Sequence, residues 1–194
     1  MKKKLFIAGG IVVITFIMLI VCNFSYLRLR ISTPNQFFIK TENHFEIQSG
    51  NACSGYAAAY VFRHLGVDAK GEEIYQDIPG KNTDGTVTPE RLTWYLNKKG
   101  YEADLCYGSL LQLKNAVSKG IPVIVFVRVS GDSSDYHYLS VTGYDDEYIY
   151  VAESLGYMVN NKENYYNRKI KTEEFKKMWK TDIRRKNLFI IISK

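Results

Sequence analysis

The sequence predicts an α+β domain in which helices come first and antiparallel strands follow. Between residues 52 and 119, segments with helix starts and stops are separated by short turns rich in glycine and polar residues. From Ile121 onward the chain becomes rich in β-branched and aromatic residues, in runs as short as strands. An uncharged apolar run from Leu5 to about Phe24 precedes this domain and is long enough for one transmembrane helix.

The predicted helices are bounded by residues that typically start or stop a helix. Thr88 precedes Pro89, which suits the first helical position, and the helix is expected to end at Gly100. A helix from about Ala52 to Leu65 begins with small side chains. Small side chains allow close backbone approach, so we expect this helix at the centre of the domain. Further helices are expected over residues 70–76, 109–119 and 172–180.

The second half of the chain predicts an antiparallel sheet. Residues 121–129 are β-branched and nearly all apolar, which is typical of a buried strand. Residues 137–144 and 148–152 predict a hairpin that turns about Asp145-Asp146-Glu147. A last strand is expected over residues 188–192, so the sheet gathers strands from the whole C-terminal half.

We expect residues 1–24 to form a signal anchor, residues 25–44 a stalk, and residues 45–194 the folded domain. The three lysines before the apolar run predict a cytoplasmic N-terminus and a domain that lies outside the cell membrane, held by a single pass. A cleaved signal peptide is the competing interpretation, but no A-x-A site follows the run. Lipidation at Cys22 is a third option, which the bulky Val21 before it disfavours.

The charge distribution argues against a nucleic-acid partner. The chain carries a net charge of +6, but five of its basic residues and none of its acidic residues lie within residues 1–30. The remaining chain is therefore close to neutral, and the basic charge belongs to the predicted anchor. No CxxC or HExxH motif and no cluster of His and Cys appears in the sequence, so we expect neither a metal nor another cofactor.

Four residues propose a chemistry. Cys53 stands at the start of the small-residue helix, where unpaired N–H groups and a partial positive charge favour a thiolate. His137 opens the first hairpin strand and can serve as its base, while the second strand returns Glu153 diagonally opposite, within reach of the imidazole. Gln48 precedes the cysteine by five residues, and its amide can help the Cys53 N–H hold an oxyanion.

Each of these residues also has an ordinary structural interpretation. Cys53 can be a small core residue, His137 a residue at a strand edge, Glu153 a turn acid and Gln48 an exposed loop residue. Together they favour a thiol enzyme, because four requirements of one mechanism fall on suitable elements in a suitable order. A disulfide between Cys53 and Cys106 is an alternative, although no wider cysteine framework supports it. We favour free thiols, with Cys106 as an ordinary apolar residue in the strand-like segment 101–107.

These residues resemble the C39-like branch of the papain-fold cysteine peptidases. One anchor of the resemblance is Gln48 with Cys53 and its small-residue helix. The other is His137-Tyr-Leu-Ser-Val-Thr-Gly-Tyr-Asp-Asp followed by Tyr-Ile-Tyr-Val-Ala-Glu-Ser, which is similar to the family's His strand, Gly-Tyr-Asp turn and Asp-Pro ending. The resemblance implies Cys53 as nucleophile, His137 as base, Glu153 in the acid position and Gln48 in the oxyanion hole. The chain departs from the family pattern in having Cys-Ser-Gly for Cys-Gly and Glu-Ser for Asp-Pro.

The sequence therefore predicts a membrane-anchored cysteine peptidase that hydrolyses a peptide or protein substrate through a Cys53 thioester. Two alternatives use the same residues. The thiol can serve a cell-wall amidase or an acyltransferase, because the triad activates a nucleophile without choosing the acceptor. A papain-like fold without activity can also bind peptides at the surface. The sequence does not indicate the oligomeric state.

Overall fold

The computed structural model describes residues 2–182 and 184–193, and the side chains of residue 14 and of residues 17 onward within that range. The chain forms two compact units, one that ends at Pro34 and one that begins at Asn35. The first unit is the helix α1 (Lys2–Ser32). Its residues 17–22 are all exposed and, apart from Cys22, large and apolar. Among the described residues, we find no helix with the length and apolar character required to cross a membrane. The predicted span over residues 5–24 includes side chains outside the described set.

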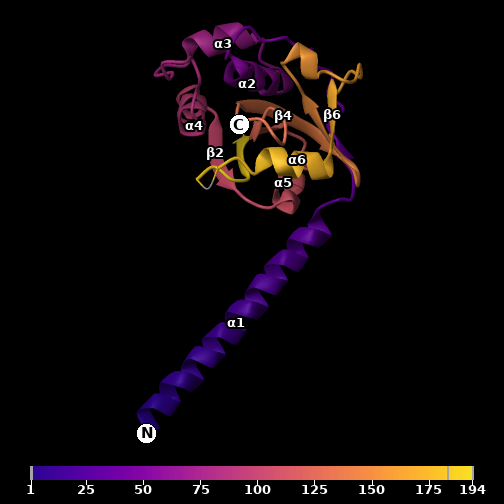
Figure 1. Ribbon diagram of the computed structural model, residues 1–194. Helices are drawn as coiled ribbons and strands as arrows, with labels where there is room; N and C mark the ends of the chain where they lie inside the picture. The colour runs from indigo at the N-terminus through magenta and orange to yellow at the C-terminus, as the bar shows by residue number, and fades with distance from the viewer. Residues whose placement is uncertain (1, 183, 194) are drawn as a thin grey trace. The chain divides into compact units, whose positions relative to one another are not determined.

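The second unit is built on one antiparallel sheet (Figure 1). The strand order is β2-β7-β3-β4-β5-β6, and a short β1 pairs with β4 as an additional strand. The strands are β1 (Phe37–Phe38), β2 (Glu102–Tyr107), β3 (Val123–Arg128), β4 (Tyr136–Tyr144), β5 (Tyr148–Ala152), β6 (Arg168–Lys171) and β7 (Leu188–Ser193). The first and last elements of the domain thus meet in one sheet, and its central strand β4 carries His137 of the candidate site.

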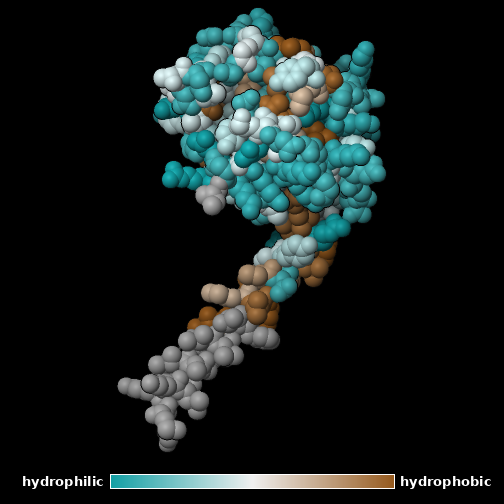
Figure 2. Space-filling model, viewed as in Figure 1, coloured by the Kyte–Doolittle hydropathy of each residue, from teal (hydrophilic) through white to brown (hydrophobic). Residues whose placement is uncertain are grey.

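Helices cover both faces of this sheet (Figure 1). One face packs against α2 and α4, and the other against α5 and α6. The central strand β3 shows the division, because Ile124 and Phe126 face the first cluster while Val123, Val125 and Val127 face the second. The helices are α2 (Cys53–His64), α3 (Gly71–Asp77), α4 (Pro89–Lys98), α5 (Leu110–Val117) and α6 (Thr172–Trp179), with a 3-10 turn η1 at Gly156–Met158. In the view of Figure 2 the outer surface of the domain is mostly hydrophilic.

The α+β class and the antiparallel sheet are confirmed, and the helix boundaries follow their local signals. Thr88 caps α4 by accepting the Arg91 N–H, as predicted. Ser109 forms a capping box with Gln112 at the start of α5. The hairpin also forms where expected, with strands that end at Tyr144 and begin at Tyr148. Local sequence therefore accounts for most elements of the domain.

The strand-like segment around Cys106 forms β2, whereas β1 and β6 were not predicted. Phe37 and Phe38 of β1 pair with Tyr144 and Gly143 of β4, so the folded unit starts at Asn35 rather than near Phe45. A two-residue strand has no periodicity that a sequence pattern can reveal. β6 was missed because its four residues include three basic side chains, which do not resemble a strand of the core.

Candidate active site

The helix α2 carries Cys53 as its first residue and is held tightly in the domain. A Cβ atom on Gly55 would lie 2.5 Å from the Tyr75 nitrogen, so α3 approaches α2 more closely than any side chain permits. On the other side, the buried Ser140 hydroxyl of β4 donates to the Ala57 carbonyl at 3.0 Å. These contacts fix the start of α2 against the sheet, with the Cys53 side chain half-buried. Cys53 and Cys106 are both free thiols.

His137 lies in β4 and is almost completely buried. Its Nε2 is 2.7 Å from Glu153 Oε1, and the Cys53 side chain is close enough to raise the pKa of the ring. Since Nε2 faces the carboxylate, Nδ1 is the ring nitrogen left for the thiol. The structure therefore brings Cys53, His137 and Glu153 together in one chain of contacts.

The electrostatic surroundings of His137 favour its charged form. Burial lowers the pKa of the imidazole, but the hydrogen bonds with Cys53 and Glu153 and the negative charge of both partners outweigh it. The pKa of His137 is raised to about 9. The ring is then an imidazolium at neutral pH, which is the state that stabilises a neighbouring thiolate.

Glu153 follows the end of β5, and the hairpin register places it beside His137. Ser140 pairs with Ala152, so position 153 falls opposite residue 139, diagonally across from His137. The pairing of the two strands shifts by one residue between Val141 and Gly143, as in a β-bulge. The pairs on the Glu153 side of this shift are therefore offset by one residue from those near the turn. The predicted diagonal arrangement is present, and the glutamate side chain, which is longer than that of an aspartate, reaches the imidazole.

Several groups stabilise the buried Glu153 carboxylate. Burial raises its pKa, but the hydrogen bond and charge of His137, the Leu155 N–H and the charge of Arg168 outweigh burial and lower it. Arg168 Nη1 lies 2.7 Å from Oε2, and the Leu155 N–H donates to Oε1 at 2.7 Å. Asn167 binds the Glu153 backbone on both sides, accepting its N–H at 2.7 Å and donating to its carbonyl at 2.8 Å. Glu153 is therefore ionised and held in one position.

Sequence reasoning missed Arg168 and Asn167. A signal for Arg168 exists in β6, where Arg168 and Ile170 are buried and the two lysines are exposed. A charged side chain that points from a strand into the core needs a buried partner of opposite charge. The identity of that partner is set by β5–β6 pairing, which the sequence does not indicate.

Gln48 lies close to the same site through Ser154, the residue after Glu153. The Ser154 hydroxyl donates to Gln48 Oε1 at 2.7 Å, and the Gln48 N–H donates to the Ser154 carbonyl at 2.9 Å. Gln48 Nε2 donates to the Gly50 carbonyl at 2.7 Å within the turn that leads into α2. The fourth predicted residue is therefore tied both to the Glu153 segment and to the start of the Cys53 helix.

A hollow of about 280 Å³ opens beside Cys53. One wall consists of three aromatic rings, in which Phe126 lies 5.0 Å from Tyr136 and 5.1 Å from Tyr138 between centroids. The loop of residues 82–88 and the polar side chains of Asp135 and Arg185 also line the hollow. Three hydrogen bonds of 2.8–2.9 Å hold this loop: Asn51 to the Asp84 carbonyl, Tyr75 to the Gly85 carbonyl and Tyr138 to the Val87 carbonyl. The hollow is thus preformed next to the thiol.

An imidazole beside a carboxylate, on an antiparallel sheet and near a thiol at a helix start, is the arrangement that a cysteine peptidase of the papain-like class requires. The model of the Peptidase_C39 like family matches residues 31–186, which is most of the chain. The protein therefore belongs to the C39-like family and is a cysteine peptidase, a hydrolase. A search of curated proteins finds no significant match.

Solved structures with the same fold include other peptidases. A putative C39-like peptidase from Bacillus anthracis matches with a TM-score of 0.62 at 14% identity, over 83% of this chain and 98% of that chain. The peptidase domain of Streptococcus ComA, a bi-functional ABC transporter involved in quorum sensing, matches at 0.58 and 18%, over 77% and 98%. A double glycine motif protease from an AMS/PCAT transporter, solved with its leader peptide, matches at 0.56 and 16%, over 81% and 97%. At these identities the likeness concerns the fold.

Proposed function

We propose that this protein hydrolyses peptide bonds through a Cys53-His137-Glu153 triad. The observation that carries the proposal is that buried His137 lies 2.7 Å from the Glu153 carboxylate, and that Glu153 and Cys53 together raise its pKa to about 9. The Cys53 thiolate attacks the scissile carbonyl, and the His137 imidazolium gives its proton to the departing amine as the C–N bond breaks. Water then attacks the thioester while His137 accepts a proton from it, and the C–S bond breaks to release the acid product and restore the Cys53 thiolate.

We further propose that Gln48 and the Cys53 N–H stabilise the oxyanion. The first N–H groups of any α-helix lack acceptors within the helix, and Cys53 is the first residue of α2. The Gln48 amide adds a second donor from the turn before the helix. One such donor typically contributes a factor of about 10²–10³ in rate.

The substrate that we propose is a peptide, one of whose side chains enters the hollow beside Cys53. The three rings and the pinned loop that line it suit a large side chain next to the scissile bond. A fold relative was solved with a leader peptide, which supports a peptide ligand for this fold without identifying the sequence cleaved here.

We also propose that the chain is held at the cell membrane by its N-terminal segment, with the catalytic domain outside. The support is the uncharged run over residues 5–24 and the exposed apolar side chains of α1. Extraction of cell membranes at high pH checks the anchor, since a retained anchor keeps the protein in the pellet. Release into the soluble fraction would contradict it.

The pH dependence of Cys53 alkylation by iodoacetamide tests the triad. The full chain carries Cys22→Ser and Cys106→Ser, so that one thiol remains, and is compared with His137→Ala and with His64→Ala as a matched control. We expect fast labelling at pH 5–6 that persists in His64→Ala and is lost in His137→Ala. Labelling that rises only near pH 8.5 in all three proteins, as for an ordinary thiol, would contradict the proposal and favour a peptide-binding module.

A further inference from the structure

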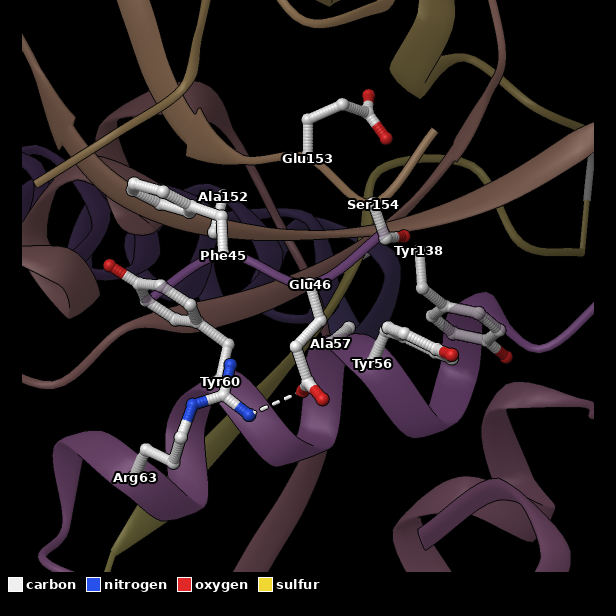
Figure 3. A pocket seen from close by; sticks show the side chains of 10 residues that line it. All are labelled: Phe45, Glu46, Tyr56, Ala57, Tyr60, Arg63, Tyr138, Ala152, Glu153 and Ser154. Atoms are coloured by element: carbon white, nitrogen blue, oxygen red, sulfur yellow. Dashed lines mark hydrogen bonds and ion pairs between the residues drawn. The ribbon is translucent and has the colours of Figure 1, made fainter. Parts of the chain in front are cut away.

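The dipeptide Glu153-Ser154 connects two parts of the site. The Glu153 side chain contacts His137, whereas the Ser154 hydroxyl contacts Gln48. Figure 3 shows the two side chains pointing to different sides of the chain, as expected for consecutive residues in extended backbone. One short segment therefore touches both the residue that we assign as base and the residue that we assign as oxyanion donor.

The contacts of Gln48 determine which way its amide points. An amide has an oxygen that accepts and an NH₂ group that donates, so its orientation follows from its neighbours. Oε1 lies 2.7 Å from the Ser154 hydroxyl, and Nε2 lies 2.7 Å from the Gly50 carbonyl oxygen. A rotated amide would place two carbonyl oxygens against each other at Gly50. In the observed orientation one hydrogen of Nε2 is donated to Gly50, and the second is the hydrogen that the proposed oxyanion role would use.

We propose that Ser154 is a positioning residue for this oxyanion donor; the inference rests on the oxyanion role proposed for Gln48. By donating to Oε1, the Ser154 hydroxyl keeps the amide oxygen away from the oxyanion and turns the NH₂ group toward it. This is also a reason for Glu-Ser at the place where the resembled family has Asp-Pro, since proline has no hydroxyl to donate.

The surroundings of Ser154 are rigid enough for this role. Ser154 is 7% exposed, and two hydrogen bonds from the Asn167 side chain fix the backbone of Glu153 just before it. The pocket that Ser154 lines together with Glu153 and Tyr138 is small, with a volume of about 10 Å³ (Figure 3). The buried backbone on either side of Glu153 thus holds Ser154 beside Gln48.

Two reactions of Cys53 separate this role from a structural one. Transfer of an acetyl group from p-nitrophenyl acetate passes through an oxyanion, whereas alkylation by iodoacetamide displaces iodide at a saturated carbon and forms none. The full chain with Cys22→Ser and Cys106→Ser is compared with its Ser154→Ala, Ser154→Thr, Gln48→Ala and Ser154→Ala/Gln48→Ala variants. We expect Ser154→Ala to slow acetylation roughly tenfold, less than loss of the donor itself, and to leave alkylation unchanged.

Two further results are expected from the same set. Ser154→Thr keeps the hydroxyl and should restore most of the acetylation rate. The double variant should react no more slowly than Gln48→Ala alone, because Ser154 acts through Gln48. Unchanged acetylation in Ser154→Ala, multiplicative losses in the double variant, or an equal loss of alkylation would each overturn the inference. If Gln48→Ala itself leaves acetylation unchanged, the oxyanion role of Gln48 and the Ser154 inference both fail, while the triad is judged by the alkylation profile.

Discussion

Replacing Arg168 by methionine should destabilise the fold at neutral pH, because it leaves one oxygen of a buried carboxylate without its cation. Arg168 and Glu153 are 8% and 0% exposed at the side chain, and the ion pair is 2.7 Å long. Removing one partner of a buried pair typically costs about 3–5 kcal/mol. Glu153 keeps its contacts with His137 and the Leu155 N–H, so we expect the lower end, about 3 kcal/mol.

The pH dependence of this loss follows from the pKa of Glu153. That pKa is lowered in the folded protein, since the hydrogen bonds and positive charges around the carboxylate outweigh the effect of burial. The pKa of a glutamate in the unfolded chain is about 4.3. Because the pKa is lower in the folded protein, the ionised carboxylate stabilises the fold at pH values above about 4.3, and this contribution is lost as the pH falls through the folded pKa. The gap between wild type and Arg168→Met should therefore narrow below about pH 4, where a proton can neutralise Glu153.

Urea denaturation of the full chain at pH 7 and at pH 3, below the unfolded pKa of a glutamate, measures both effects. Lys70→Met is the matched control, because it removes a cation from the exposed Lys70–Glu73 pair and should change the unfolding free energy far less. A loss below about 1 kcal/mol for Arg168→Met at pH 7, or a gap that does not change with pH, would refute the reasoning.

Two further predictions concern the geometry of α2 and the charge of His137. Gly55→Ala places a methyl group against the Tyr75 nitrogen and the Gly71 carbonyl, which are backbone atoms, so thermal and urea unfolding should show a loss of about 1–3 kcal/mol or more. Glu73→Ala in α3 is its exposed control, and equal effects would contradict the close approach. Burial lowers the pKa of His137 and its partners raise it, so Glu153→Gln should move the alkaline limb of acetylation by p-nitrophenyl acetate from about pH 9 toward about 6.5. An alkaline limb that stays near pH 9 would show that the carboxylate does not hold the imidazolium.

The sequence indicated the chemistry of the site because that chemistry depends on residue types at element ends. The helix that Cys53 begins follows from its run of small residues, and the strand that His137 enters follows from its residue composition. The distance from His137 to Glu153 across the hairpin follows from strand lengths, and the structure places the two side chains in contact. Such features involve neighbours within about twenty residues, where propensity and period carry information.

The tertiary structure alone decided what surrounds these residues. Arg168 reaches Glu153 only because β6 pairs with β5, and Ser154 meets Gln48 across 106 positions of sequence. The short strand at Phe37–Phe38 and the aromatic wall of the hollow likewise depend on contacts between distant segments. Local sequence determines where a helix or strand begins, whereas the partner of a buried charge is set by the packing of whole elements, which no single segment encodes.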